Sequence, residues 1–153
     1  MTGDHTRRDV RERTRVLGVD LGSRRIGVAV SDPGATIAIP SSVVQRSGDR
    51  PTDHRAIVGA ANEAEAGMIV VGLPLSLSGR AGPAARAARA EVEELRALAE
   101  PFGIAVDTYD ERLTTVIAHR RLDAAHVKGR ARRRVVDEVA AAVMLQSYLD
   151  TRR

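Results

Sequence analysis

The sequence predicts an α/β protein with a mixed sheet of five strands, and two features of the 153-residue chain lead to this fold class. Apolar segments at 16–20, 26–31 and 37–44 follow one another with short connections, as in an antiparallel meander. After them, strand-like segments alternate with helical ones, which is typical of parallel strands joined by right-handed crossovers. We expect one domain over residues 15–153, preceded by a mobile tail at 1–14 that alternates in charge and lacks periodicity.

The middle of the chain continues this pattern. Residues 45–52 are polar and predict a loop, after which Asp53 can cap a helix that runs to about Ala66. The run Met68-Ile69-Val70-Val71 is apolar throughout, which predicts a strand buried on both faces and therefore parallel to a neighbour. Residues 73–82 predict a loop that forms a wall or lid of a site.

The last part of the chain predicts one more strand and three helices. Pro83 suits the first turn of a helix that Pro101 and Gly103 end. Residues 104–109 then predict a strand, and two helices are expected at about 115–124 and 135–149.

The amino-acid composition excludes some classes of function and favours others. Hydrophobic residues make up 43% of the chain and aromatic residues 2%, so we expect an aliphatic core and no aromatic platform for base stacking. The net charge of +4 favours a polyanionic partner only weakly. The lack of cysteine excludes disulfides, cysteine-ligated zinc and a thiol nucleophile. No signal peptide or membrane-spanning run is present, so a cytoplasmic location is expected.

Two acidic residues stand where predicted strands end. Asp20 ends the first strand beside a turn that contains Gly22, a place where metal and phosphate sites are often built. The alternative is a turn aspartate that bonds its own backbone. Glu111 follows the strand at 104–109, and its alternative is a solvated acid near a helix N-terminus.

A third acid, Asp137, opens the last predicted helix on the same side as several apolar residues. Those residues are Ala140, Ala141, Met144 and Tyr148. A carboxylate that faces a core needs a partner, because an unpaired buried charge is costly. Asp137 is therefore expected either to pair with an arginine or to ligate a metal, and the residues leave both alternatives open.

Four blocks of the sequence carry a family resemblance. They are Asp-Leu-Gly-Ser-Arg-Arg-Ile-Gly-Val-Ala-Val-Ser-Asp (20–32), Val-Val-Gly-Leu-Pro-Leu (70–75), Asp-Glu-Arg-Leu-Thr-Thr (110–115) and Val-Asp-Glu-Val-Ala-Ala (136–141). In this order they resemble the motifs of the YqgF/RuvX family of pre-16S rRNA nucleases, which are also described as Holliday-junction-resolvase-like. Ser23 and Arg24 depart from the Thr and Lys usual in the family, and neither departure removes a carboxylate.

The resemblance implies an RNase H-like fold, a five-stranded mixed sheet flanked by helices, and a catalytic acidic cluster carried onto Asp20, Glu111 and Asp137. Such a cluster would hold Mg²⁺ or Mn²⁺, most simply two ions, because hard cations prefer oxygen ligands. Two divalent ions can activate a water molecule and neutralise charge on a phosphodiester during its hydrolysis.

A basic segment lies directly before Asp137, and Gly129 is expected to keep it pliable. A charge run is usually a solvated face. Here its position favours contact with the phosphates of a nucleic acid. The residues that we assign to nucleic-acid binding are Lys128, Arg130, Arg132, Arg133 and Arg134.

Several functional alternatives stay open at this point. The resemblance favours processing of the 5′ end of pre-16S rRNA during ribosome biogenesis over resolution of branched DNA, although no residue decides between them. Asp20-Leu21-Gly22-Ser23 also resembles the first phosphate loop of the actin and sugar-kinase superfamily, but the chain is short for two lobes. A nucleic-acid-binding factor without nuclease activity is a third possibility. The protein is expected to be a monomer or a homodimer.

Overall fold

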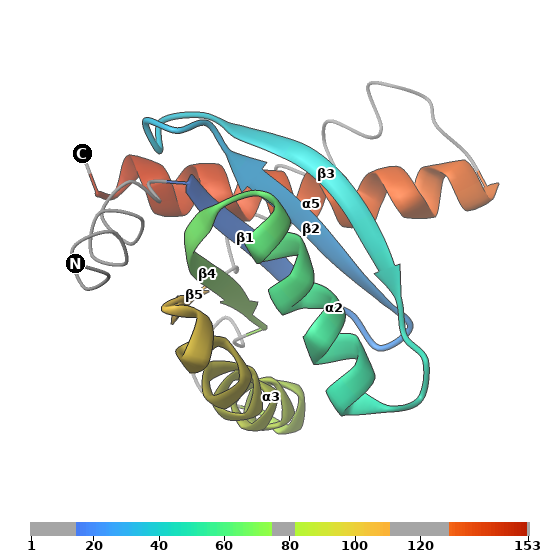
Figure 1. Ribbon diagram of the computed structural model, residues 1–153. Coiled ribbons are helices and arrows are strands. Elements are labelled where there is room, and N and C mark those ends of the chain that lie inside the picture. The colour runs from blue at the N-terminus through green and yellow to red at the C-terminus, as the bar shows by residue number, and fades with distance from the viewer. Residues whose placement is uncertain (1–14, 75–81, 111–128, 153) are drawn as a thin grey trace.

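The structure is a computed structural model that describes residues 15–74, 82–110 and 129–152, with the backbone alone for 129–136 and 138. Its five strands form one sheet in the order β3-β2-β1-β4-β5 (Figure 1). The strands are β1 (Arg15–Leu21), β2 (Arg25–Ser31), β3 (Ala38–Gln45), β4 (Ala66–Leu73) and β5 (Ala105–Asp110). The predicted five-stranded mixed sheet is therefore confirmed.

The pairing of the strands follows the sequence pattern. Strands β1, β2 and β3 form the predicted antiparallel meander. Strand β4 is parallel to both β1 and β5, as its continuous apolar run predicted. Because β1, β4 and β5 run in the same direction, their C-terminal ends lie at one edge of the sheet.

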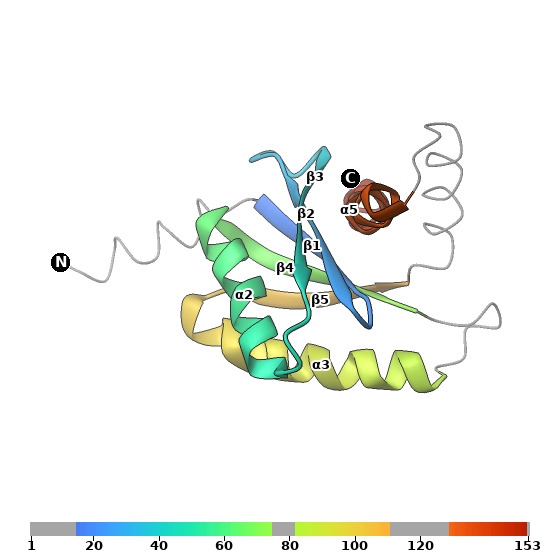
Figure 2. The same cartoon turned by 90° about the vertical axis from the view of Figure 1, so that its right-hand side faces the viewer.

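Helices cover both faces of this sheet. Helices α2 (Arg50–Glu63) and α3 (Pro83–Ala99) lie on one face, and α5 (Gly129–Asp150) lies on the other (Figure 2). Alternation of side chains along β1 divides its residues between two aliphatic cores. Leu17 and Val19 belong to the core under α2 and α3, and Val16 belongs to the core under α5.

The start of α2 differs from the prediction. The residue that caps the helix is Asp49, whose side chain accepts a hydrogen bond from the backbone N–H of Thr52 at 3.2 Å. Pro51 stands in the first turn, where the lack of an N–H costs nothing. Asp53 is instead buried inside the helix and accepts a hydrogen bond from the backbone N–H of Ser47 at 3.0 Å.

The predicted end of α3 is confirmed. A 3₁₀ turn at Glu100–Phe102 follows the helix, and Gly103 has a φ of 71°, a left-handed conformation that glycine adopts without strain.

The start of α5 also corrects a prediction. We expected the last helix to begin near residue 135, after a pliable basic segment, but α5 begins at Gly129. The arginine run, Arg130 to Arg134, therefore lies in the first turns of the helix. Arginine is a good helix former, which explains this continuity, and Gly129 marks the helix start and not a hinge.

Some predictions fall outside the described residues. They are the tail at 1–14, the helix at 115–124, most of the loop at 73–82, Glu111 and Lys128. Within the described part of the chain, every helix is too short or too polar to span a lipid bilayer.

Candidate active site at the end of the central strand

Asp20 lies near the C-terminal end of β1, the central strand of the sheet. Residues 16, 18 and 20 share one face of the strand because side chains alternate. Val16 packs in the core under α5, and Gly18 lies against Ala141 and Leu145 of that helix. The Asp20 side chain therefore points to the face that α5 covers.

Glycines flank Asp20 on both neighbouring strands. Asp20 is paired with Gly27 of β2 and with Gly72 of β4. Residues paired in this way place their side chains on the same face of the sheet. Because neither partner has a side chain, neither neighbouring strand crowds the Asp20 carboxylate at this level of the sheet.

The glycine on β2 also allows α5 to approach. A Cβ atom added to Gly27 would lie 2.1 Å from the backbone oxygen of Asp137 and 2.7 Å from its carbonyl carbon. Only glycine permits such contact between a strand and a helix backbone. Asp137 is thus held against the residue that pairs with Asp20, so the fold brings two of the three predicted acids together.

Arg25 neutralises one of these acids in the structure. Its Nε donates a hydrogen bond of 2.6 Å to Oδ2 of Asp137, in an ion pair whose side chains are 24% and 21% exposed. Arg25 and Gly27 lie on the same face of β2, which explains how the guanidinium reaches α5. Of the two alternatives that the sequence left open for Asp137, the structure shows the arginine pair.

The third acid lies outside the described residues, and the basic residues are placed only in part. Strand β5 ends at Asp110, the residue directly before Glu111, at the same edge of the sheet as Asp20. Glu111 itself lies outside the described residues, as does Lys128. The backbone of the arginine run lies in the first two turns of α5, N-terminal to Asp137. Among residues whose side chains are described, no three acids or histidines form a metal-binding group.

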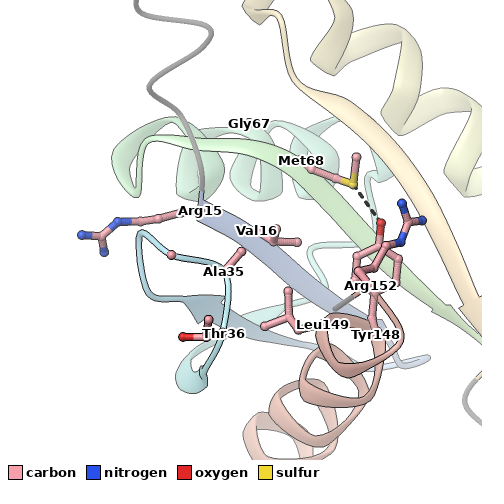
Figure 3. A pocket seen from close by; sticks show the side chains of 10 residues that line it. Arg15, Val16, Ala35, Thr36, Gly67, Met68, Tyr148, Leu149 and Arg152 are labelled. Carbon is pink, nitrogen blue, oxygen red and sulfur yellow. Dashed lines mark hydrogen bonds between the residues drawn. The ribbon is translucent and has the colours of Figure 1, made fainter.

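A cavity of about 470 Å³ lies elsewhere in the molecule, near the start of β1 and the end of α5 (Figure 3). Val16, Met68 and Leu149 line it together with the more polar Tyr148 and Arg152. None of its lining residues is acidic. Asp20 is four residues along the strand from Val16, a distance of about 13 Å, so this cavity is separate from the acidic site.

Tyr148 is not poised for chemistry in this cavity. Its hydroxyl donates to Asp107 Oδ2 at 3.0 Å and lies 3.2 Å from the Met68 sulfur, a second and weaker acceptor. Burial, together with the Asp107 carboxylate, raises the pKa of Tyr148 to about 12. The phenol therefore stays protonated at neutral pH.

Sequence reasoning missed Arg25, although a usable signal was present. Its spacing of two from Gly27 and four from Ala29 places it on the face of β2 that meets α5. Sequence reasoning also missed the contacts of Arg46. These contacts lie on the opposite face of the sheet and join segments far apart in the chain.

Comparison with known proteins shows the family to which the chain belongs. The family model described as "RuvX: Holliday junction resolvase" matches residues 14–151. The chain belongs to the RuvX family. The resemblance seen in its four sequence blocks is therefore confirmed.

RuvX relatives in several bacteria are similar over most of the chain. A protein of Thermobifida fusca is 47% identical over 144 residues, covering 90% of this chain and 87% of the relative. A protein of Thermoanaerobacter pseudethanolicus is 41% identical over 140 residues, covering 91% and 98%. Both carry the name "Putative pre-16S rRNA nuclease". Nuclease activity is common to these names and to the RuvX family description, as the sequence predicted.

Solved structures confirm the RNase H-like fold of this RuvX chain. RuvC of T. thermophilus, solved with a Holliday junction substrate, matches with a TM-score of 0.56 and 14% identity, over 91% of this chain and 95% of RuvC. The yeast mitochondrial Holliday junction resolvase Ydc2 matches with a TM-score of 0.52 and 13% identity, over 97% and 85%. At such low identity these matches bear on the fold alone.

Proposed function

We propose that this RuvX-family protein is a metal-dependent nuclease whose active site is formed by Asp20, Glu111 and Asp137. The observation that supports this proposal is the contact of the Asp137 backbone with Gly27, the residue paired with Asp20. It joins the end of the central strand to the long helix on that face. Family membership and the position of Glu111 after β5 point to the same edge of the sheet.

The chemistry of the described acids fits Mg²⁺ or Mn²⁺. Asp20 and Asp137 are both carboxylates, whose oxygens are the ligands that these cations prefer. The glycines paired with Asp20 keep side chains of the neighbouring strands from crowding its oxygens. Asp20, Glu111 and Asp137 would hold the metal, which when bound supplies charge neutralisation and an activated water at the scissile phosphate. Arg25 holds a positive charge at Asp137, so it compensates this acid when metal is absent and competes with metal for its oxygens.

The arginine run supplies the proposed contact with nucleic acid. Arg130 to Arg134 precede Asp137 by three to seven residues on α5, which corresponds to about 5–11 Å along the helix axis. A phosphate backbone bound there would lie near the acidic site. Such contacts position a substrate without reading its sequence.

For the substrate we propose precursor 16S rRNA, cleaved near its 5′ end in the cytoplasm. The names of the relatives from T. fusca and T. pseudethanolicus support this choice. The family description supports a second candidate, a branched DNA such as a four-way junction. A junction presents two symmetric strands and would favour a homodimer, whereas end processing of RNA can be done by a monomer.

One experiment compares the two substrates. The purified protein is incubated with a precursor 16S rRNA fragment and with a synthetic four-way junction, each with Mg²⁺ or Mn²⁺, and products and oligomeric state are measured together. Cleavage of the rRNA fragment alone is expected. Preferential, symmetric cutting of the junction by a dimer would reverse the substrate assignment and leave the nuclease site in place.

A further inference from the structure

Arg46 holds the turn between β1 and β2, which connects Asp20 with Arg25. Its Nε donates a hydrogen bond to the carbonyl oxygen of Gly22 at 2.9 Å, and its backbone N–H donates to the carbonyl oxygen of Arg24 at 2.9 Å. The Gly22 N–H in turn donates to the carbonyl oxygen of Asp20 at 3.1 Å. Arg46 is thus bonded to two points of a turn that begins directly after the predicted catalytic strand end.

Gly22 lies close to the far end of the turn. A Cβ atom added to Gly22 would lie 2.4 Å from the carbonyl oxygen of Arg25, so the two ends of the turn are close together. Arg25 at its far end pairs with Asp137. A shift of the turn would therefore move both the acid at its start and the cation at its end relative to α5.

The guanidinium of Arg46 is fixed from the other side by α3. Its Nη1 donates to Glu91 Oε2 at 3.0 Å, and its Nη2 lies 2.9 Å from Glu91 Oε1, which is a two-point contact. The two side chains are 15% and 13% exposed. Burial of Glu91 opposes its ionisation, but the hydrogen bonds from Arg46 and His54 outweigh it, and the pKa of Glu91 lies below its usual range.

His54 of α2 completes the arrangement. Its Nε2 lies 2.9 Å from Glu91 Oε2, and its side chain is 1% exposed. Glu91 therefore has one oxygen shared between a buried histidine and an arginine, so its position is set by two helices and by the segment after β3. A partly buried, two-point arginine contact of this kind orients its groups more strictly than a surface ion pair does.

We propose that Arg46, oriented by Glu91 and His54, is a positioning residue for the acidic site, fixing the β1–β2 turn so that Asp20 keeps its place opposite Asp137. This inference rests on the proposed function. It assigns a role to side chains that lie on the opposite face of the sheet from α5. Residues that orient the ligands of a metal typically change its affinity by about 10- to 100-fold when removed.

The test uses the full chain and Mn²⁺ alone as the probe, without nucleic acid. Mn²⁺ affinity is measured by electron paramagnetic resonance, and hydrogen exchange is followed at the amides of residues 22–25. Arg46→Ala is expected to weaken Mn²⁺ binding by about 10- to 100-fold and to speed exchange in the turn. Arg46→Lys keeps the charge but offers one nitrogen in place of the three that bond Gly22 and Glu91, so it should not restore affinity.

Arg50→Ala is the matched control. Arg50 also links α2 to α3, through an ion pair of 3.0 Å with Glu94, but both side chains are about half exposed and neither contacts the turn. Glu94 lies 3.7 Å from Nδ1 of His54, beyond hydrogen-bond distance. Arg50→Ala should leave the Mn²⁺ affinity and the rate of hydrogen exchange in the turn at wild-type values. If Arg46→Ala does not fold, Glu91→Gln decides, with a smaller loss in the same direction expected.

The outcomes separate this inference from the proposed function. Wild-type Mn²⁺ affinity and slow turn exchange in a folded Arg46→Ala protein, with only a lower melting temperature, would overturn the positioning role. If the wild-type protein itself binds no Mn²⁺, the proposed function fails. Turn exchange then still decides whether Arg46 fixes the turn.

Discussion

Replacement of Gly27 by alanine perturbs the packing of α5 on the sheet more directly than any other single change at the site. The new Cβ would lie 2.1 Å from the Asp137 carbonyl oxygen, whereas ordinary contacts begin at 3.4 Å. The helix or the strand must therefore move by about 1.3 Å at this point to restore an ordinary contact. Because the overlapping atom, the Asp137 carbonyl oxygen, belongs to the backbone, rotation of a side chain cannot relieve the overlap.

Two consequences follow from this displacement. Overpacking of this kind costs about 1–3 kcal/mol of the free energy of unfolding. For a chain of this size each kcal/mol lowers Tm by about 2–4 °C. A shift of about 1 Å in a catalytic group also costs about 100-fold in rate, so kcat/KM should fall by about that factor.

The assay combines thermal unfolding with metal-dependent cleavage of a precursor 16S rRNA fragment. Gly59→Ala is the matched control, because a Cβ at this α2 position meets nothing within 4 Å. Removing a glycine from a helix interior should raise stability by about 0.5–1 kcal/mol and leave cleavage unchanged. A Gly27→Ala protein with wild-type Tm and wild-type cleavage would refute the close approach of α5 to β2 on which the site depends.

Three further changes test separate parts of the site and fold. Arg25→Gln should tighten Mn²⁺ binding, because Asp137 loses the cation that shares its carboxylate; weaker binding would show that Arg25 does not compete with metal. Asp32 has its pKa lowered to about 2 from 3.8 by hydrogen bonds from the N–H groups of Ile37 and Thr36 and from the Thr36 hydroxyl. Its stabilising effect should therefore be full above pH 3.8 and vanish as pH falls through about 2, so the Tm difference between wild type and Asp32→Asn should shrink over that window. Alanine at four arginines should flatten the plot of log affinity against log salt by about 0.7–0.9 per lost phosphate contact, with little change in Mn²⁺ affinity, and an unchanged slope would place the substrate elsewhere. Those arginines are Arg130, Arg132, Arg133 and Arg134.

Much of the fold could be predicted because its determinants are local. The apolar runs and short connections gave the meander, and the fully apolar run in β4 gave its parallel pairing. The cap of α2 could have been placed correctly as well. Asp49 followed by Pro51 is the usual order of a capping residue and a first-turn proline, which favours Asp49 over Asp53 as the cap.

Other features could not be predicted because they join residues far apart in the chain. Arg46 and Glu91 are 45 residues apart, and His54 and Glu91 are 37 apart. Nothing in the local pattern at any of the three indicates a partner. The start of α5 was missed for a different reason. The run of arginines was interpreted by its charge alone. Arginine also has a high helix propensity, so the helix that follows the run extends back through it to Gly129.

Asp20→Asn tests most directly whether Asp20 belongs to a metal-dependent nuclease site. The substitution keeps the shape of the side chain and removes its charge. Asp32→Asn is the control, since it makes the same exchange directly after the end of β2, at the opposite edge of the sheet. Cleavage of a precursor 16S rRNA fragment is measured with Mg²⁺ or Mn²⁺ alongside a melting curve. We expect Asp20→Asn to stay folded and to lose about 1000-fold or more in kcat/KM, equivalent to about 4 kcal/mol, while Asp32→Asn stays active at neutral pH. Full metal-dependent cleavage by a folded Asp20→Asn protein would show that Asp20 is not part of the nuclease site.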